Sequence, residues 1–177
     1  MLSMNTKQMS SIGDNHDEID FEFLGNETGQ PYTFHTNVFA DGVGQKEMQF
    51  GPWFDPTADF HNYTIFWNPC MIQISQAAEG VPFPTRRPMY AFSSIWAAED
   101  WATQGGRVKT DWSKAPFVAD DPPPAAPTAA APDLCKLTDR QLHEIGSVQL
   151  GYTIYNYCDH PEKYNGTVPP ECGMPQY

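Results

Sequence analysis

Apolar and acidic side chains alternate strictly in residues 16–24, H-D-E-I-D-F-E-F-L. The apolar positions are Ile19, Phe21 and Phe23, and the acidic positions are Glu18, Asp20 and Glu22. Because alternate residues of a strand share a face, this pattern predicts a strand with one buried apolar side and three acids on the other. A helix would scatter both sets around its circumference, so the pattern favours a strand.

Short segments of similar character follow this one, each ending close to a glycine or proline. Residues 32–39 and 63–67 are rich in β-branched and aromatic side chains, which indicates two further strands. Several such strands at short spacing are typical of an antiparallel sandwich. We therefore predict an all-β fold, an antiparallel β-sandwich, for residues 1–118.

The last third of the chain has a different pattern. Residues 119–133, A-D-D-P-P-P-A-A-P-T-A-A-A-P-D, predict a semi-rigid, solvated linker between the sandwich and a C-terminal extension at 134–177. The sequence T-D-R-Q from Thr138 to Gln141 has the form of a capping box, which predicts a helix beginning there. One face of that helix would carry Leu142, Ile145 and Val148, and residues 152–157 would form a short strand after it.

The net charge narrows the classes of partner. The 177 residues carry 10 Lys and Arg against 22 Asp and Glu, a formal net charge of −12. Such a surface repels nucleic-acid phosphates and anionic lipids, so we expect binding to neither nucleic acid nor membranes. We also expect a monomer. The sequence contains neither an 18-residue apolar run nor an N-terminal signal peptide, so the chain as given has no route out of the cytosol.

The cysteines and sequons point the other way, towards secretion. Cys158 and Cys172 flank a Pro-rich, turn-rich segment with little else to hold it, so we predict a disulfide there, with two separate buried thiols as the alternative. Cys70 lies in an aromatic run and is predicted to be a buried free thiol. N-x-[ST] sequons occur at Asn26, Asn62 and Asn165. A chain truncated at its N-terminus would reconcile these signs with the missing signal peptide.

The three acids of residues 16–24 suggest a chemistry. Two carboxylates raise the pKa of a third, which keeps one acid protonated near neutral pH. Cleavage of glycosides needs such a set, with one ionised and one protonated carboxyl group. A solvated acidic face on an edge strand and a Ca²⁺ site are the alternatives, although one strand cannot wrap an ion and no glycine turn follows. The five histidines lack metal-ligand spacing, so we expect neither a metal nor a cofactor.

The run H-D-E-I-D-F-E-F-L-G-N resembles the active-site strand of the plant xyloglucan endotransglucosylase/hydrolases, in glycoside hydrolase family 16. Further matching segments follow in the family's order: Q-P-Y-T-F-H-T-N-V-F, W-F-D-P-T-A-D-F-H-N-Y-T-I-F-W-N-P, G-V-P-F-P-T-R-R-P-M, W-A-A-E-D-W-A-T-Q-G-G-R-V-K-T-D-W and Y-N-Y-C with P-P-E-C. Together they cover most of residues 10–118 and 134–177. The resemblance implies a curved jelly roll with a xyloglucan-binding cleft on its concave face, in a secreted glycoprotein of the plant cell wall.

The resemblance also implies roles for individual residues. Glu18 matches the nucleophile, Glu22 the acid/base and Asp20 the acid that assists them. The implied mechanism is retention through a glycosyl-enzyme intermediate, released to another glucan chain or to water. The partners would be a xyloglucan donor and a xyloglucan oligosaccharide acceptor, and Asn26 matches the family's glycan site. The substrate-binding positions carried over are His35, Thr36, Asn37, Gln45, Lys46, Glu47, Asp100, Trp101 and Gly105, with Lys163 where relatives usually have Arg.

Several positions keep a second interpretation. Trp101 is predicted to be a sugar platform with a core position as the alternative, whereas Trp53, Trp67 and Trp96 are predicted to lie in the core. His35 and Asn37 are alternatively polar strand residues with satisfied hydrogen bonds.

The sequence also departs from the family's pattern. Strands before residue 16 and after residue 74 are expected to be missing, and Cys135 lacks an obvious partner. These departures leave an inactive glucan-binding fragment as the second function. A lichenan-type β-glucanase is a weaker alternative, because the P-P-E-C region resembles the xyloglucan-active branch.

Overall fold

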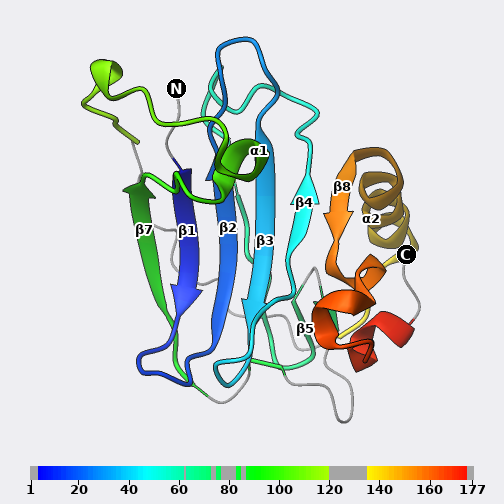
Figure 1. The fold of residues 1–177 in the computed structure, drawn as a ribbon. Helices are drawn as coiled ribbons and strands as arrows, with labels where there is room; N and C mark the ends of the chain where they lie inside the picture. Colours follow the sequence, from blue (N-terminus) through cyan, green and yellow to red (C-terminus); the bar gives the residue numbers. More distant parts are fainter. Residues whose placement is uncertain are drawn as a thin grey trace.

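A computed structural model describes residues 4–61, 63–72, 75–76, 83–84, 87–119 and 135–174. Its strands are β1 (Met4–Ser10), β2 (Glu18–Leu24), β3 (Thr33–Phe39), β4 (Met48–Phe50), β5 (Met71–Ile72), β6 (Ser75–Gln76), β7 (Tyr90–Trp96) and β8 (Thr153–Asn156) (Figure 1). Its helices are α1 (Ala102–Gly106) and α2 (Asp139–Tyr152), with the 3-10 turns η1 (Trp112–Lys114), η2 (Tyr157–Asp159), η3 (Pro161–Tyr164) and η4 (Pro170–Gly173). The predicted all-β architecture with a C-terminal helix and strand is confirmed.

Six strands form one antiparallel sheet in the order β7-β1-β2-β3-β4-β8, and β5 pairs with β6 in a second, two-stranded sheet (Figure 1). β2 is an interior strand, because β1 and β3 pair with it along its full length. The alternative of a solvated acidic face on an edge strand is therefore wrong for β2. β1 itself was not anticipated from the sequence.

Cross-strand pairs assign every residue of β2 to one of two faces. Ile19 pairs with Val38, and Phe21 with Thr36, on what we call the core face. The opposite face, here called the cleft face, carries the pairs Glu18 with Phe39, Asp20 with Asn37 and Glu22 with His35. Because the period of a strand is two residues, the predicted separation of apolar and acidic side chains is confirmed.

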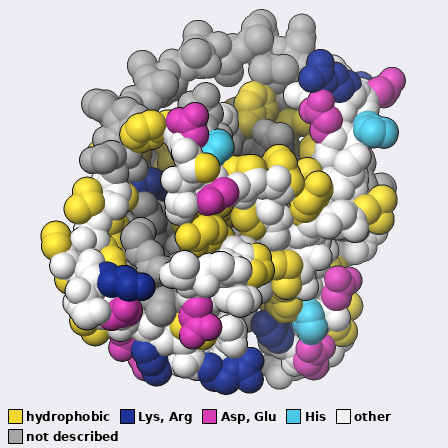
Figure 2. Space-filling model, turned by 90° about the horizontal axis from the view of Figure 1, so that it is seen from above, with side chains coloured by type: hydrophobic (Ala, Val, Ile, Leu, Met, Phe, Trp, Pro, Cys, Tyr) yellow, Lys and Arg dark blue, Asp and Glu magenta, His cyan; other side chains and the backbone are white. Residues whose placement is uncertain are grey.

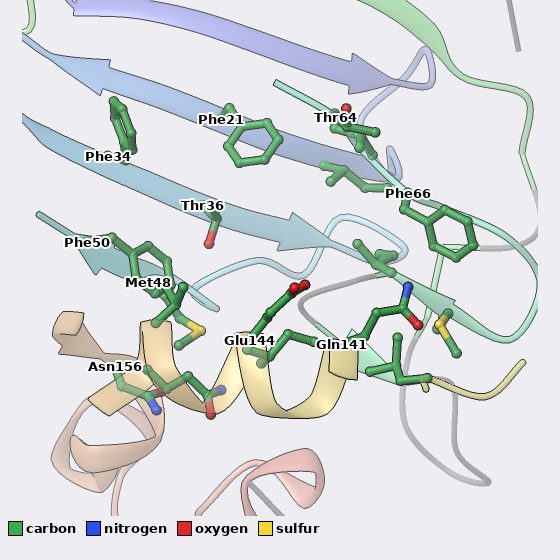
Figure 3. Close-up of a pocket in the computed structure, with 18 of the residues that line it drawn as sticks. Phe21, Phe34, Thr36, Met48, Phe50, Thr64, Phe66, Gln141, Glu144 and Asn156 are labelled. Atoms are coloured by element: carbon green, nitrogen blue, oxygen red, sulfur yellow. The ribbon is translucent and has the colours of Figure 1, made fainter. Parts of the chain in front are cut away.

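The core is small and lies against the core face. Ile19 is 2% exposed and clusters with Val38 and Ile72, with Trp67 packed beside them. A cavity of about 710 Å³ separates the core face of β2–β4 from α2. Phe21, Thr36 and Met48 point into this cavity from the sheet, and Glu144 faces them from α2 (Figure 3). This cavity therefore lies mainly on the side of the sheet opposite the cleft face.

Several large apolar side chains are exposed. Trp53 is 59% exposed and Trp96 is 43% exposed, so their predicted core positions are wrong, whereas Trp67 is half-buried with its Nε1 donating to the Pro84 carbonyl at 2.7 Å. All seven residues of β7 are exposed. Seen from above, apolar side chains lie between scattered charged ones over the upper surface (Figure 2).

The predictions for the C-terminal helix, for residues 63–67 and for the linker have different outcomes. α2 begins with the predicted capping box, because the Thr138 and Gln141 side chains each bind the other's backbone N–H. Residues 63–67 do not form the predicted strand. They run as a loop that makes one isolated bridge, between Trp67 and Ile72, because no long partner strand lies beside them. The linker predicted at 119–133 lies, except for its first residue, outside the described residues.

One disulfide closes a loop within the C-terminal part, and the other joins this part to the sheet-forming part of the chain. The predicted Cys158–Cys172 bridge is present, with a Cα–Cα distance of 5.3 Å. The prediction of a free Cys70 is wrong, because Cys70 is bonded to Cys135 across 65 residues of sequence. The second bridge ties the segment before α2 to the loop before β5. Among the described helices, none has the length and hydropathy needed to cross a bilayer.

Candidate active site

The acidic side chains of β2 are buried to different degrees. The side chains of Glu18 and Glu22 are 16% and 21% exposed, whereas Asp20 between them is 4% exposed. Burial, together with the charges of both glutamates and a hydrogen bond with Glu18, raises the pKa of Asp20 to about 9. The cluster therefore holds a proton at neutral pH, as the sequence predicts. That proton rests on Asp20 because the middle acid is the most buried of the three.

Glu18 is held by neighbours on the cleft face and at the start of its own strand. Gln8 of β1 donates from Nε2 to Glu18 Oε2 at 2.9 Å, and His16 Nε2 lies 3.9 Å from the same oxygen. The hairpin that brings Gln8 there is closed by Ser11, whose backbone N–H donates to the Asp17 carbonyl and whose Oγ accepts from the Asp17 N–H. The candidate nucleophile therefore has a fixed partner.

Glu22 belongs to a row of side chains that crosses the cleft face. Cross-strand pairs join Thr6 to Glu22, Glu22 to His35, His35 to Gln49 and Gln49 to Tyr155. His35 is 5% exposed, and its Nδ1 lies 3.6 Å from Glu22 Oε2. Since adjacent strands lie about 4.8 Å apart, this row extends about 14 Å from Glu22 to Tyr155.

Trp101 lies beside His35, with the two ring centroids 6.0 Å apart. It precedes α1, which is anchored to the end of β2 because Thr103 Oγ1 donates to the Gly25 carbonyl at 2.6 Å and Ala102 packs on Leu24. Trp101 is 44% exposed, which fits a sugar platform better than a core position.

The neighbours of Trp101 in sequence are placed differently. Asp100 is exposed. Gly105 has φ +67°, a left-handed conformation that favours glycine, within the irregular helix α1. The structure thus brings Trp101 beside His35 and leaves Asp100 and Gly105 around the turn that carries it.

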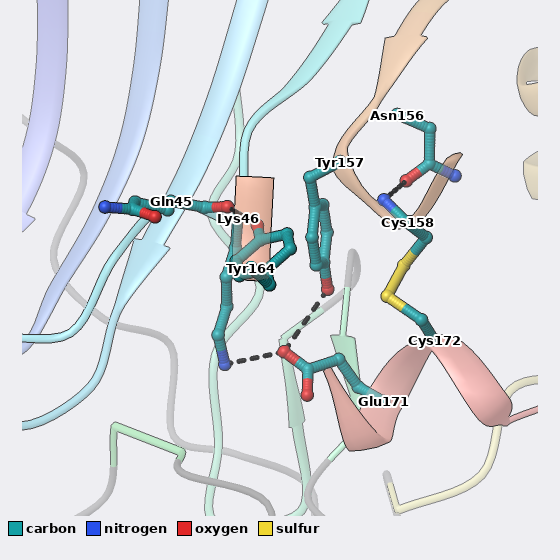
Figure 4. The surroundings of a disulfide bond; sticks show 8 residues. All are labelled: Gln45, Lys46, Asn156, Tyr157, Cys158, Tyr164, Glu171 and Cys172. Carbon is teal, nitrogen blue, oxygen red and sulfur yellow. Dashed lines mark hydrogen bonds and ion pairs between the residues drawn. A yellow bond between two sulfur atoms is a disulfide. The ribbon is translucent and has the colours of Figure 1, made fainter. Parts of the chain in front are cut away.

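Lys46 does not point into the cleft. Its Nζ forms an ion pair of 2.8 Å with Glu171 Oε1, and Tyr157 donates to the same carboxylate oxygen at 3.4 Å (Figure 4). The backbone N–H of Lys46 donates to Asn37 Oδ1 at 3.0 Å, and Asn37 pairs with Asp20 across the strands. Lys46 and Asn37 therefore connect the acidic cluster to the C-terminal extension.

The residues on either side of Lys46 are bound to the same extension. Tyr164 donates from its hydroxyl to the Gln45 carbonyl, and the Tyr157 N–H donates to the Glu47 carbonyl at 3.1 Å. Gln45 itself adopts φ +66° and is exposed. The expected binding segment 45–47 is thus fixed by its backbone.

Lys163 closes the far end of the cross-strand row. Its Nζ lies 4.5 Å above the centre of the Tyr155 ring and donates to the Tyr155 hydroxyl at 2.6 Å. That hydrogen bond raises the pKa of Lys163. His160 stacks on the Tyr155 ring at 4.7 Å between centroids. The cation is therefore fixed at the end of the row that begins at Glu22.

Thr36 lies on the other face of the sheet from its chain neighbours. It lies on the core face opposite Phe21, is 3% exposed, and its Oγ1 has no hydrogen-bond partner among the described residues. His35 and Asn37, its chain neighbours, lie on the cleft face. Strand alternation alone separates Thr36 from them.

Asn26, the expected glycan position, lies in the turn after β2. Its Nδ2 donates to the Pro31 carbonyl at 2.7 Å, and its Oδ1 accepts from the Glu27 N–H. The described residues contain no group of three or more His, Cys, Asp or Glu arranged to hold a metal ion, and the Ca²⁺ alternative gains no support.

Comparison with known proteins decides the family. Residues 3–114 match the model of glycosyl hydrolases family 16, and residues 126–172 match the xyloglucan endo-transglycosylase C-terminus. Probable xyloglucan endotransglucosylase/hydrolase protein 12 of Arabidopsis thaliana is 45% identical over 198 residues, covering 94% of this chain and 68% of the relative. The chain belongs to glycosyl hydrolase family 16.

Other relatives place it within that family. Xyloglucan endotransglucosylase protein 7 of Diospyros kaki is 41% identical over 198 residues, covering 96% of this chain and 74% of the relative. The resemblance to the plant xyloglucan endotransglucosylase/hydrolases is thereby confirmed, and the antiparallel architecture is consistent with the jelly-roll sandwich of family 16.

Sequence reasoning missed Gln8, Tyr157 and Glu171. Tyr157 and Glu171 reach the site through contacts with segments far away in the sequence, and Gln8 reaches it through the register of a hairpin whose first strand was not predicted. The one usable signal was the position of Glu171 beside Cys172, which a disulfide would hold in place.

Proposed function

We propose that this family 16 chain is a retaining xyloglucan endotransglucosylase/hydrolase. It would cleave the β-1,4-glucan backbone of xyloglucan and transfer the new end to another xyloglucan chain or to water. The observation that carries the proposal is the acidic row of β2 on an interior strand, with Asp20 holding a proton between two more accessible glutamates. The matches to both family models and the names of the relatives support it.

The proposed mechanism assigns a step to each acid. The reactive form of the proposed enzyme carries a proton on Glu22 as well as on Asp20. In that form a Glu18 oxygen bonds to the anomeric carbon as the glycosidic C–O bond breaks, and Glu22 gives its proton to the leaving oxygen. An acceptor hydroxyl or water then attacks the anomeric carbon and loses its proton to Glu22, and Glu18 leaves as a carboxylate. The protonated Asp20, hydrogen-bonded to Glu18, keeps the three acids from carrying three charges at close range.

The cross-strand row supplies the proposed binding surface. His35 adjoins Glu22, Trp101 lies beside His35, and the row continues through Gln49 to Tyr155 and Lys163. The aromatic faces suit the apolar faces of sugar rings, and the polar atoms between them suit hydroxyl groups. We propose that this row binds the acceptor side of the glucan.

The proposed place of action is the plant cell wall, with a monomeric, secreted glycoprotein carrying a glycan on Asn26. The two disulfides support an oxidising compartment, because such bonds persist outside the cytosol.

A non-catalytic glucan-binding protein is the second candidate, and one observation favours it. All seven residues of β7 are exposed, so this edge of the sheet contributes little to the core. A fold weakened there would leave binding residues in place without the rigidity that catalysis needs.

The deciding experiment mixes xyloglucan with a fluorescent xyloglucan oligosaccharide and compares wild type with Glu18→Ala. Label appearing in polymer with the wild type alone supports transfer, and shortening of the polymer without label transfer supports hydrolysis. Binding to xyloglucan by both proteins, with no change in polymer or label, would establish the non-catalytic alternative.

Retention is tested separately by trapping. A 2-deoxy-2-fluoro glycoside with an activated leaving group should add one glycosyl mass to the wild type, and peptide mapping should place it on Glu18. A glycosyl adduct on Glu22 or Asp20 would overturn the assignment of the nucleophile.

A further inference from the structure

Gln8 lies in the middle of β1, directly across from Asp20 on one side and Phe92 of β7 on the other. Cross-strand partners share a face, so the Gln8 side chain lies on the cleft face among the acids. It is half-buried. Nothing in the reaction as described so far uses it.

The amide of Gln8 makes a specific contact with the nucleophile candidate. Its Nε2 donates to Oε2 of Glu18 at 2.9 Å, a normal length for a hydrogen bond from nitrogen to a carboxylate. The Glu18 side chain is 16% exposed, so bulk water competes weakly for this oxygen. Glu18 also receives a hydrogen bond from Asp20, and its carboxylate is thus held by two neighbours.

The backbone fixes this contact. β1 and β2 are paired over seven residues each, and the short turn between them is closed by the Ser11–Asp17 hydrogen bonds. The Asp17 side chain in turn accepts from the Asp41 N–H at 2.8 Å. Gln8 therefore has little freedom to move away from Glu18.

We propose that Gln8 is a positioning residue for Glu18 that speeds the breakdown of the glycosyl-enzyme, an inference that rests on the retaining mechanism proposed above. In the intermediate, one Glu18 oxygen is bonded to the anomeric carbon and the other is an ester carbonyl oxygen. When the acceptor hydroxyl attacks, the bond between the anomeric carbon and Glu18 breaks and its electron pair returns to the carboxylate. The acceptor's proton goes to Glu22.

Negative charge thus develops on the group to which Gln8 donates. A hydrogen bond to a charged oxygen is stronger than one to a neutral carbonyl, so the Gln8 contact tightens as the second step proceeds. In the first step the charge on Glu18 decreases instead, and the same bond gives no such gain. Removing the donor should therefore slow the second step selectively.

The variants separate the donor from the shape of the side chain. Gln8→Met has similar length and no N–H donor, and Gln8→Glu keeps the shape but places another acid beside Glu18. Gln30→Met makes the same change in an exposed turn and serves as the matched control. Gln8→Asn, which keeps an amide on a shorter arm, replaces Gln8→Met if the latter does not fold.

The experiment mixes each protein with an activated aryl glycoside of a xyloglucan oligosaccharide. Released phenol is followed from the first turnover, and the fraction of covalent enzyme is read by acid quench and intact mass. We expect Gln8→Met to slow steady-state turnover about tenfold while the burst and the covalent fraction increase. Gln8→Glu should behave in the same way, Gln8→Asn should fall between wild type and Gln8→Met, and Gln30→Met should match the wild type.

Two results would overturn the inference while leaving the proposed function intact. One is a Gln8→Met variant whose turnover and covalent fraction equal those of the wild type. The other is equal slowing of both steps with a lower melting temperature, which would show that Gln8 only supports the fold. If the wild type forms no covalent species and turns over no more substrate than Glu18→Ala, the proposed retaining mechanism is wrong. The proposed role of Gln8 is then wrong as well.

Discussion

β8 and β7 are the two edge strands of the same sheet, but they are supported in different ways. β8 continues into turns that are fixed by the Cys158–Cys172 bridge and by the Lys46–Glu171 ion pair (Figure 4). β7 has seven exposed residues and pairs with β1 alone among the described strands. The acids of β2 lie between these edges. The sheet is therefore supported from the C-terminal side, where the row from Glu22 to Tyr155 lies.

The largest expected effect comes from removing the ion pair on the supported side. Glu171→Leu leaves the Lys46 ammonium, whose side chain is 13% exposed, without its partner. An uncompensated buried charge lowers the free energy of unfolding by about 3–5 kcal/mol. Denaturant titration measures this change, and Glu144→Leu, which breaks an exposed pair with Arg140, should change it by less than about 0.5 kcal/mol. Equal losses in both variants would remove the distinction between the two sites.

A smaller loss is expected from opening the disulfide at the same edge. Cys158→Ser with Cys172→Ser releases a loop of 14-residue separation, which lowers stability by about 3 kcal/mol on the chain-entropy estimate. Chemical denaturation under non-reducing conditions measures it. Wild type treated with a thiol reductant should be at least as unstable as this double variant. A reductant-treated wild type with unchanged stability would show that neither bridge contributes to the fold.

The pH dependence tests the strand between the two edges. Since the pKa of Asp20 is about 9 in the folded protein, against an ordinary aspartate value of 3.8, the folded state binds more protons over that interval. The contribution of Asp20 to the free energy of unfolding is therefore greatest in acid. It falls as the pH rises towards 9, by at most about 1.4 kcal/mol per pH unit. Asp20→Asn should flatten that slope in unfolding curves taken between about pH 5 and about pH 8. Parallel slopes for both proteins would mean that Asp20 is ionised in the folded state.

The smallest effect is expected on β7. Ile95 is 38% exposed, so Ile95→Val should change the free energy of unfolding by less than about 0.5 kcal/mol. The same substitution at Ile19, which is 2% exposed, should lower it by about 0.5–1.5 kcal/mol. Thermal unfolding of the matched pair gives the comparison directly. A larger loss at Ile95 than at Ile19 would show that the β7 edge is covered in solution.

The features that were predicted correctly from the sequence are those that depend on local patterns. The period of two in residues 16–24 gave β2 and its two faces, and the T-D-R-Q box gave the start of α2. The same period also separates Thr36 from His35 and Asn37.

Contacts between distant segments could not be predicted in this way. The Cys70–Cys135 bridge spans 65 residues, and the Gln8–Glu18 hydrogen bond depends on the register of a strand that the sequence did not reveal. Residues 63–67 have the composition of a strand, but a strand also needs a partner, and this segment has one bridge only. The exposure of Trp53 and Trp96 likewise depends on what packs beside them, which composition does not encode.

Glu171 is the chain neighbour of Cys172, so the ion pair of Glu171 with Lys46 is coupled to the oxidation state of the Cys158–Cys172 pair. Oxidation of Cys158 and Cys172 to the disulfide restricts the position of the Glu171 carboxylate, which forms the ion pair with Lys46. The Lys46 N–H donates in turn to Asn37, which pairs with Asp20, so the restriction extends to the strand beside Asp20. The thiol–disulfide poise of the compartment therefore acts on the strand that pairs with β2 beside Asp20. In a reducing environment the chain keeps the same acids but loses the tether that sets their surroundings.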